Sequence, residues 1–253
     1  MAVSSPLSIL DYRQPVEFRI GEVIVRSWNI FSRHFLTFVL LVGVAELLPL
    51  VLTLYVTRKI DPANPMAAGA LVFANGLISF ILSTCAHAIV VFAAFQDLRG
   101  RPVNAGESLR QGIGRLFPVI IASLLTGLVV GVGVLLCLIP GLIALTAMAV
   151  AVPACVVERM GPMESMSRSA DLTSGHRWPI LAVGVAWLLT VFIVSLSIRA
   201  AMPSDQALPA QLLNWVWQVL QGSFAAVYAA ILYHDLRAVR EGIGIDEIAS
   251  VFD

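Results

Sequence analysis

The stretch from Val119 to Val157 decides the fold: VIIASLLTGLVVGVGVLLCLIPGLIALTAMAVAVPACVV. It has no charged residue and is far too long for one membrane span, which needs roughly 20 mostly apolar residues. Near its middle stands Ile139-Pro140-Gly141, and proline next to glycine breaks a helix and favours a turn. The stretch therefore predicts two spanning helices that are joined by a tight hairpin at these three residues.

Four more apolar stretches flank this hairpin, two before it and two after it. They predict an all-α, polytopic membrane protein with six transmembrane helices. The predicted spans are residues 35–56, 67–95, 118–138, 141–157, 179–198 and 210–233. The chain then divides into a cytoplasmic arm with an interfacial helix (1–34), a membrane domain (35–233) and a cytoplasmic tail (234–253). The first residues lack a charged segment followed by an apolar one, so we expect no cleavable signal peptide.

The composition supports this class of protein and argues against others. Apolar residues make up 58% of the 253-residue chain and charged residues 13%, against about 25% charged in soluble domains. The mean hydropathy is +0.88. The formal net charge is zero, which gives no electrostatic basis for binding nucleic acid. We find no motif of a zinc enzyme, a phosphate-binding loop or a serine hydrolase, and we expect no enzyme activity, no cofactor and no metal.

The three cysteines lie within or at the ends of apolar runs, at positions 85, 137 and 155. No two of them have the spacing of metal ligands. We interpret them as small apolar packing residues without disulfides.

Basic residues are distributed unequally between the two sides of the predicted membrane domain. Of the sixteen Lys and Arg residues, thirteen fall in the arm, in the loops after the second and fourth spans, and in the tail. The other side has only Arg58, Lys59 and Arg199. Short loops rich in Lys and Arg stay in the cytoplasm. We therefore expect both termini to be cytoplasmic.

Three cytoplasmic segments, one before each pair of spans, have the pattern of interfacial amphipathic helices. The first has a polar face of Arg19, Glu22, Arg26, Asn29 and Arg33 and an apolar face of Ile20, Ile24, Trp28 and Phe31. The second has a potential capping box of Asn104 with Glu107 and an apolar stripe of Leu109, Ile113 and Leu116. The third covers residues 163–174.

An aromatic residue begins the span after each of these segments: Phe35, Phe117 and Trp178. A basic residue or histidine stands two positions before it in each case. This recurrence predicts three parallel repeats, each an interfacial helix followed by two spans. The alternative is that any amphipathic helix entering a membrane has such residues.

Two strongly ionisable residues lie well inside predicted spans, Glu46 in the first and His87 in the second. Each lies about 15 Å from the cytoplasmic end of its span, at 1.5 Å per residue, so the two can meet at one depth. Ser83 and Thr84 lie beside His87. Such a polar cluster either binds a proton, an ion or a headgroup, or fixes helix packing by a hydrogen bond between helices.

Other residues in the spans have roles in packing. Gly127 with Gly131, and Gly222 with Ala226 and Ala230, predict close helix approach. Pro153 predicts a kink in the fourth span. The last-span amides either line a cavity or bond to neighbouring helices, and we favour bonding; they are Asn214, Gln218 and Gln221.

Several short motifs carry a resemblance to a known family. They are Ile139-Pro140-Gly141, Val156 to Gly161, Ser167-Arg168-Ser169, Leu172 to Trp178, Tyr233 to Arg237, and Arg240-Glu241-Gly242. The chain resembles the glycerophosphoryl diester phosphodiesterase membrane-domain family and related bacterial inner-membrane proteins. In that family such a membrane region precedes a soluble phosphodiesterase domain. Only about 20 residues follow Tyr233 here, so the resemblance implies a protein of the bacterial cytoplasmic (inner) membrane and does not imply phosphodiesterase activity.

The motif residues also suggest a cytoplasmic site, made of Glu158, Arg168, Arg177, Arg237 and Arg240. These side chains either form a polar network or bind anionic lipid headgroups. From this we expect a non-enzymatic module that binds membrane lipids or serves as a scaffold for a partner protein or a second copy. The alternatives are a small proton-linked transporter that uses Glu46 and His87, and a component of glycerophospholipid metabolism.

Overall fold

The structure, a computed structural model, describes residues 18–59, 64–100, 105–202 and 207–241. These residues form helices and no strand, which confirms the all-α class. In chain order the helices are α1 (Ile20–Arg33), α2 (Phe35–Lys59), α3 (Pro65–Leu98), α4 (Ala105–Gly114), α5 (Leu116–Leu136), α6 (Leu138–Ala147), α7 (Ala151–Val157), α8 (Pro162–Thr173), α9 (Arg177–Ala201) and α10 (Ala207–Glu241).

Six of the described helical stretches are long and apolar enough to cross a membrane: α2, α3, α5, α6 with α7, α9 and α10. Their large apolar side chains are widely exposed. On α9, for example, Leu188, Phe192 and Leu196 are each more than half exposed, and Ile180 is the one buried residue of that helix. A helix that is apolar all round and still exposed is typical of a lipid-facing span. The chain is therefore a multi-pass membrane protein.

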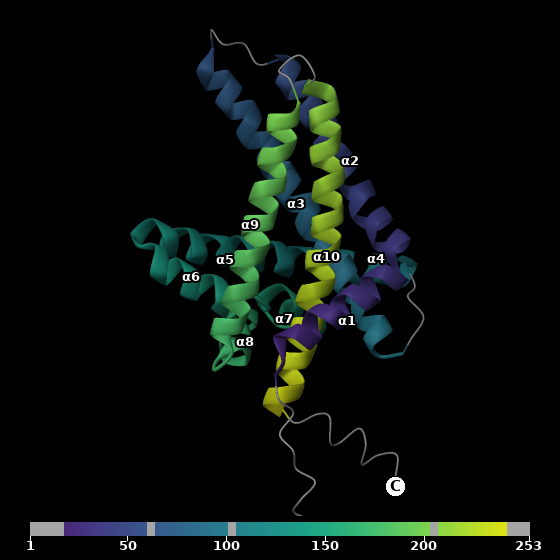
Figure 1. Ribbon diagram of the computed structural model, residues 1–253, viewed down its shortest axis with the longest axis vertical. Helices are drawn as coiled ribbons and strands as arrows, with labels where there is room; N and C mark the ends of the chain where they lie inside the picture. Colours follow the sequence, from purple (N-terminus) through teal and green to yellow (C-terminus); the bar gives the residue numbers. More distant parts are fainter. Residues whose placement is uncertain (1–17, 60–63, 101–104, 203–206, 242–253) are drawn as a thin grey trace, which may run out of the picture.

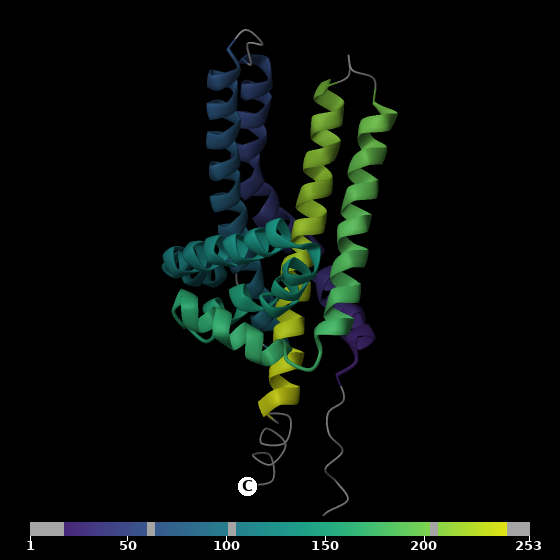
Figure 2. The ribbon, with the colours of Figure 1, turned by 90° about the vertical axis from the view of Figure 1, so that its left-hand side faces the viewer.

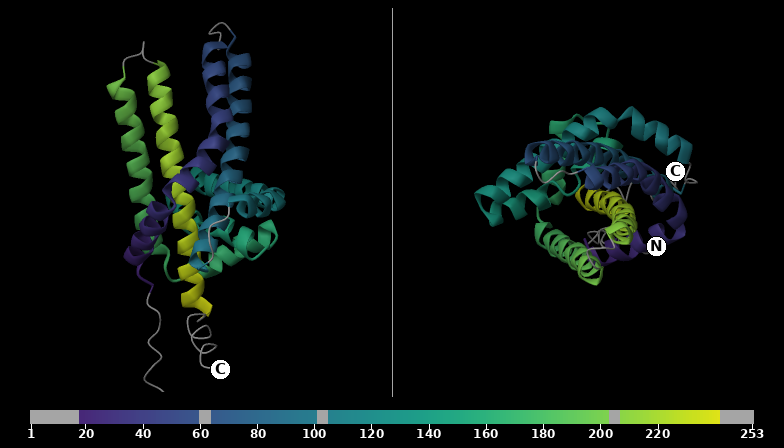
Figure 3. Two further views of the ribbon diagram at one scale, coloured as in Figure 1. Left: turned by 90° about the vertical axis from the view of Figure 1, so that its right-hand side faces the viewer. Right: turned by 90° about the horizontal axis from the view of Figure 1, so that it is seen from above.

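The six stretches do not all run in one direction (Figure 1). Helices α2, α3, α9 and α10 stand upright, whereas α5 and α6 run side by side across them (Figure 2). The pair α2–α3 separates from the pair α9–α10 toward the end at which α2 and α9 end and α3 and α10 begin (Figure 3). We expected three equivalent pairs of spans, and the crosswise middle pair contradicts that equivalence.

The turn of the crosswise hairpin falls earlier than the sequence predicts. Cys137 is extended, with φ −170° and ψ 148°, and α6 already begins at Leu138. Pro140 stands in the first turn of α6, where a helix needs no backbone N–H donor and tolerates proline. Gly141 serves close packing instead, because a Cβ on it would lie 2.7 Å from the backbone nitrogen of Val134.

The predicted small-residue contact of Gly127 with a neighbouring helix is wrong, and so is that of Gly131. A Cβ added at either glycine meets nothing within 4 Å. The close approach on α5 lies instead at Gly133, where a Cβ would come 2.9 Å from the Cα of Gly141. Cys137 at the hairpin turn is exposed, so its predicted packing role is wrong as well; Cys155 is buried as expected.

The fourth span is broken rather than kinked. Helix α6 ends at Ala147 and α7 begins at Ala151, with Pro153 in the first turn of α7. Ser169 of α8 bridges the break: its hydroxyl donates to the carbonyl of Ala147 at 2.7 Å and accepts from the backbone N–H of Val150 at 3.2 Å. A side chain thus satisfies backbone groups that the break leaves free, as a membrane interior requires.

Three short amphipathic helices, α1, α4 and α8, lie where the sequence predicts them. Each buries small polar residues against the bundle: Ser27 on α1, Ser108 on α4, and Ser165 and Ser169 on α8. Part of their apolar surface packs into the core, as Val23, Ile30, Phe31 and Leu172 do, and part stays exposed; Trp28 is 59% exposed and Ile113 is 55% exposed. Such a face suits the membrane interface. The predicted capping residue Asn104 lies outside the described residues.

The same backbone joint precedes α2, α5 and α9. His34, Arg115 and His176 have φ of −112°, −116° and −119°, and ψ of 26°, 7° and 15°. At the first joint the carboxylate of Asp97 holds the chain, because it accepts from Nε2 of His34 at 2.9 Å and pairs with Arg33 at 3.7 Å. The local unit of amphipathic helix, joint and apolar helix therefore recurs three times, although the pairs that follow differ in direction.

The core lies where the C-terminal parts of α3 and α10 pack together. On α3 nearly every residue from Ala86 to Gln96 is buried. On α10 the buried residues include Ala226, Ala230 and Tyr233, whose ring lies 5.6 Å from that of Phe95. Toward their other ends the same two helices become exposed and separate. A cavity lies in the region where the two helices separate.

Candidate functional site

A polar cavity of about 690 Å³ lies between α2, α3, α9 and α10. Eleven of its lining side chains are polar: four hydroxyls, four carboxamides, one carboxylate, one guanidinium and one imidazole. The polar lining consists of Glu46, Thr53, Ser79, Ser83, His87, Ser195, Arg199, Gln211, Asn214, Gln218 and Gln221. Polar groups at this density are costly inside a membrane unless they meet water, ligand or one another.

The cavity reaches deep along three helices. Its lining runs from residue 42 to 53 on α2, from 76 to 87 on α3 and from 211 to 225 on α10. At 1.5 Å per residue these segments are about 16 Å long on α2 and α3 and about 21 Å long on α10, half or more of a 30 Å hydrocarbon core. One end of the cavity, which we call the mouth, is lined by Arg199 near the end of α9 and Gln211 near the start of α10, and the other end, which we call the floor, is lined by His87 and Gly222.

Glu46 is the buried acid of this cavity, with 8% of its surface exposed. Its carboxylate accepts a short hydrogen bond from the hydroxyl of Ser83. Its backbone carbonyl accepts from Nε1 of Trp215 at 3.1 Å. Glu46 is thus fixed by α3 and α10 together.

His87 lines the same cavity, but no hydrogen bond joins it to Glu46 in the part of the chain that the structure describes. Its ring packs against α10 where residue 222 is glycine; a Cβ there would lie 3.2 Å from Nε2 of His87. His87 also lines a second cavity of about 190 Å³, next to the break in the fourth span. Thr84 lines that second cavity and not the first. The predicted four-residue cluster is therefore divided between two cavities.

The amides of α10 line the large cavity, so the bonding to neighbouring helices that we favoured is wrong for Asn214, Gln218 and Gln221. Asn214 donates to the carbonyl of Ala210 on its own helix at 2.9 Å. Nearer the mouth, Gln211 does cross to α2 and donates to the hydroxyl of Thr57 at 3.4 Å.

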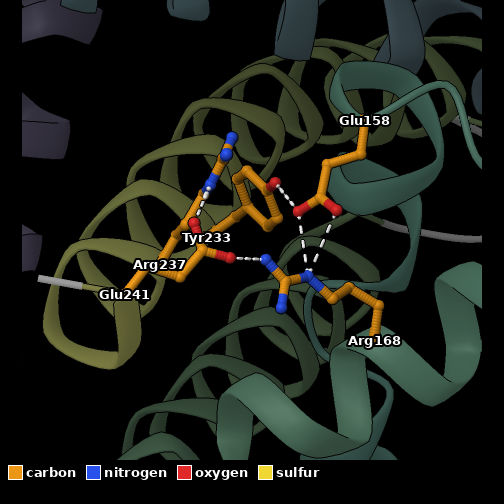
Figure 4. A network of polar contacts seen from close by, with 5 residues as sticks. All are labelled: Glu158, Arg168, Tyr233, Arg237 and Glu241. Carbon is orange, nitrogen blue, oxygen red and sulfur yellow. Dashed lines mark hydrogen bonds and ion pairs between the residues drawn. The ribbon is translucent and has the colours of Figure 1, made fainter. Parts of the chain in front are cut away.

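A separate polar network lies at the opposite end of α10 (Figure 4). Nε of Arg168 donates to both oxygens of the Glu158 carboxylate at 3.0 and 3.2 Å. Arg168 also pairs closely with Glu241, and Tyr233 donates to Glu158. Nε of Arg237 donates to Glu241 at 2.7 Å. The network therefore joins α7, α8 and α10, and its two carboxylates balance its two guanidinium groups.

Two of the arginines predicted for the cytoplasmic site lie outside this network. Nε of Arg177 is buried without a hydrogen-bond partner. Arg240 is exposed, and no ion pair holds it within the described chain. The structure thus brings Glu158, Arg168 and Arg237 together and leaves these two apart.

Sequence reasoning gave no role to three residues that shape these sites. Trp215 anchors the backbone of Glu46, Tyr233 completes the network, and Arg199 lines the cavity. A signal existed for Arg199, which is the one basic residue at the end of the fifth predicted span. Trp215 gave none, because its partner is a backbone atom far away in the sequence.

A comparison with family models matches residues 67–236 to a domain of unknown function, DUF7847. The chain belongs to the DUF7847 family. The match covers α3 to most of α10 and leaves out α1 and α2, and thus Glu46. No curated protein and no solved structure matches the chain. The resemblance to the phosphodiesterase membrane-domain family therefore stays a prediction for this DUF7847 member.

Proposed function

We propose that this chain is a non-enzymatic membrane protein that binds a polar ligand in the cavity around Glu46. The observation that carries the proposal is a carboxylate that is buried near the middle of a membrane-spanning helix, on the wall of a 690 Å³ polar cavity. An ionisable side chain at such a depth is costly, roughly 2.5–3.5 kcal/mol on insertion scales, and marks a binding site or pathway by default. Ser83 occupies only part of the hydrogen-bonding capacity of Glu46.

The direction of access follows from the distribution of charge. The mouth lies at the end of the bundle that carries Arg199, whereas the joints with Arg33 and Arg115 and the tail of α10 lie at the other end. In a bacterial cytoplasmic membrane with cytoplasmic termini, the ligand enters from the extracytoplasmic side.

The test is whether water reaches the cavity from that side. In a variant with Cys85, Cys137 and Cys155 replaced by alanine, we substitute Ser79→Cys or Gln218→Cys. A membrane-impermeant, cationic methanethiosulfonate is then added to intact cells. We expect both cavity cysteines to react. The control is Val44→Cys, 66% exposed on the outside of α2, which faces lipid and should stay unreactive.

The same experiment tests the topology. An Arg240→Cys variant at the end of α10 should react only after the cells are opened. Unreactive cysteines at both cavity positions, or reaction from the cytoplasmic side only, would contradict the proposed site.

A second candidate function, proton-linked transport, is favoured by the position of His87. Its side chain lines both cavities, so it stands between the large cavity and the space beside the broken fourth span. Broken helices at the depth of a binding site are a recurrent feature of transporters. In proteoliposomes with an internal pH dye, this function predicts ligand-dependent proton uptake that Glu46→Gln abolishes.

A further inference from the structure

We propose that the ligand of the large cavity is a phospholipid whose headgroup carries a primary ammonium. The ammonium binds at Glu46, the phosphate lies toward Arg199, and one acyl chain leaves past Phe80 along a groove on α5. This inference rests on the proposed function, because it names the ligand of the same cavity.

The deep end of the cavity suits an ammonium group. One carboxylate oxygen of Glu46 accepts from Ser83, and the described chain offers no hydrogen-bond donor to the other. A primary ammonium has three N–H donors. The side-chain carbonyl oxygens of Gln218 and Gln221, which line the same cavity, are acceptors for the remaining donors. A charge-assisted hydrogen bond to a buried carboxylate is among the stronger polar contacts in proteins.

The mouth of the cavity suits a phosphate. Arg199 is the one Lys or Arg among the residues that line the cavity, and no carboxylate pairs with it in the described chain. Its planar guanidinium binds phosphate oxygens in a bidentate way. The cavity thus has one anion at depth and one cation at the mouth, which is the charge order of a zwitterionic headgroup that enters ammonium first.

An apolar groove beside the cavity argues for a lipid rather than a free amine. Phe80 of α3 lines the cavity and also a groove of about 420 Å³ on α5. The rest of the groove consists of Ser123, Leu124, Leu125, Gly127 and Leu128. Because α5 runs across the upright helices (Figure 2), the groove leads sideways from the cavity. An acyl chain buries its methylenes there while the headgroup stays in the cavity.

The headgroup is tested by native mass spectrometry of the purified full chain. The probes are three synthetic lipids with identical acyl chains and an ethanolamine, choline or glycerol headgroup. We expect the ethanolamine lipid to bind best, because the trimethylated choline has no N–H to donate and the glycerol lipid carries a net negative charge. Glu46→Gln should weaken ethanolamine-lipid binding by about tenfold or more, the typical effect of losing one hydrogen bond to a charged group.

Two variants accompany Glu46→Gln. Glu22→Gln, on α1, changes a well-exposed carboxylate and should leave lipid binding unchanged. Arg199→Gln, at an exposed site, should weaken binding severalfold. It keeps the proposal testable if Glu46→Gln fails to fold.

The acyl chain is tested by filling the groove. A Cβ on Gly127 meets nothing within 4 Å, and Gly127 lines the groove, so Gly127→Trp places a large ring at the groove without a clash of its Cβ. Gly131, one turn further along α5, is equally open but does not line the groove, so Gly131→Trp is the matched control. We expect Gly127→Trp to lower lipid binding and Gly131→Trp to leave it unchanged. Soluble phosphoethanolamine should compete only weakly.

Three outcomes overturn the inference. Equal binding of the choline and ethanolamine lipids would contradict recognition of the ammonium. Unchanged lipid binding by the Gly127→Trp variant would contradict binding of an acyl chain in the groove. Competition by phosphoethanolamine at the affinity of the lipid identifies a free amine as the ligand. If the cavity cysteines react while any of these results is obtained, the inference fails and the proposed function stands; if they do not react, both fail.

Discussion

The hydroxyl of Ser83 on α3 donates a short hydrogen bond to the carboxylate of Glu46 on α2. The bond lies at the level where the bundle changes from a packed core to an open cavity. It orients the buried carboxylate and joins two neighbouring spans at the same time. The site and the stability of the fold are therefore coupled at this pair.

Replacing Ser83 by alanine tests that coupling. We expect Ser83→Ala to lower the free energy of unfolding by about 0.6–2 kcal/mol, the range for hydrogen bonds between helices in membranes. Ser79→Ala is the control, because Ser79 donates only to the carbonyl of Asn75 on its own helix. The measurement is the unfolding midpoint in detergent. Equal midpoints for the two variants would mean that the Ser83 bond contributes nothing to packing.

A second prediction concerns the cavity floor at Gly222. A leucine there places its Cβ 3.2 Å from the present position of Nε2 of His87, so the ring must shift slightly and the new side chain fills the floor. We expect Gly222→Leu to slow thiol labelling of a cysteine at Ser83 severalfold, while a cysteine at Ser79, nearer the mouth, keeps its rate. Gly184→Leu on α9, where a Cβ meets nothing within 4 Å, should change neither rate.

The sequence predicts the membrane architecture well, because hydropathy and length decide which segments can span. It does not predict the direction of α5 and α6, since that depends on contacts between distant elements. The turn at Cys137 was missed for a local reason. Proline followed by glycine predicts a turn at Pro140 and Gly141. Proline is equally suited to the first turn of a helix, however, and glycine to a close helix contact.

The candidate site was predictable in part. Glu46 and His87 stand out because ionisable residues are rare in spans, and both line the cavity. The split between Ser83 and Thr84 was not predictable, since neighbouring residues on a helix point about 100° apart and no pattern says which face meets a cavity. The sequence also does not say whether the amides of α10 face a cavity or a neighbouring helix. That depends on how far α2 and α3 lie from α10, and these helices belong to a distant part of the chain.

The network at the end of α10 gives a third prediction. Arg168 binds two carboxylates, so Arg168→Ala leaves Glu158 and Glu241 without it. Breaking a fully buried pair costs about 3–5 kcal/mol, and partial exposure reduces this, so we expect about 2 kcal/mol of destabilisation. Arg240→Ala is the control and should lie close to the wild type, because Arg240 is exposed and unpaired in the described chain. A thermal unfolding series in detergent decides between them; similar losses for both variants would count against a structural role of the network.

The last prediction addresses the crosswise hairpin. Gly141 packs so closely against α5 that a Cβ would lie 2.7 Å from the nitrogen and 2.8 Å from the Cα of Val134. Backbone atoms cannot move aside as a flexible side chain does, so Gly141→Ala must separate α5 from α6. Overpacking of this kind costs typically about 1–3 kcal/mol. Gly131→Ala adds the same methyl group to the same hairpin at an open position and should be neutral or slightly stabilising, since alanine favours a helix over glycine. Two quantities are measured: the rate at which the exposed Cys137 thiol reacts with a thiol reagent, and the unfolding midpoint. Loss of stability in Gly131→Ala but not in Gly141→Ala would contradict the helix contact on which the hairpin depends.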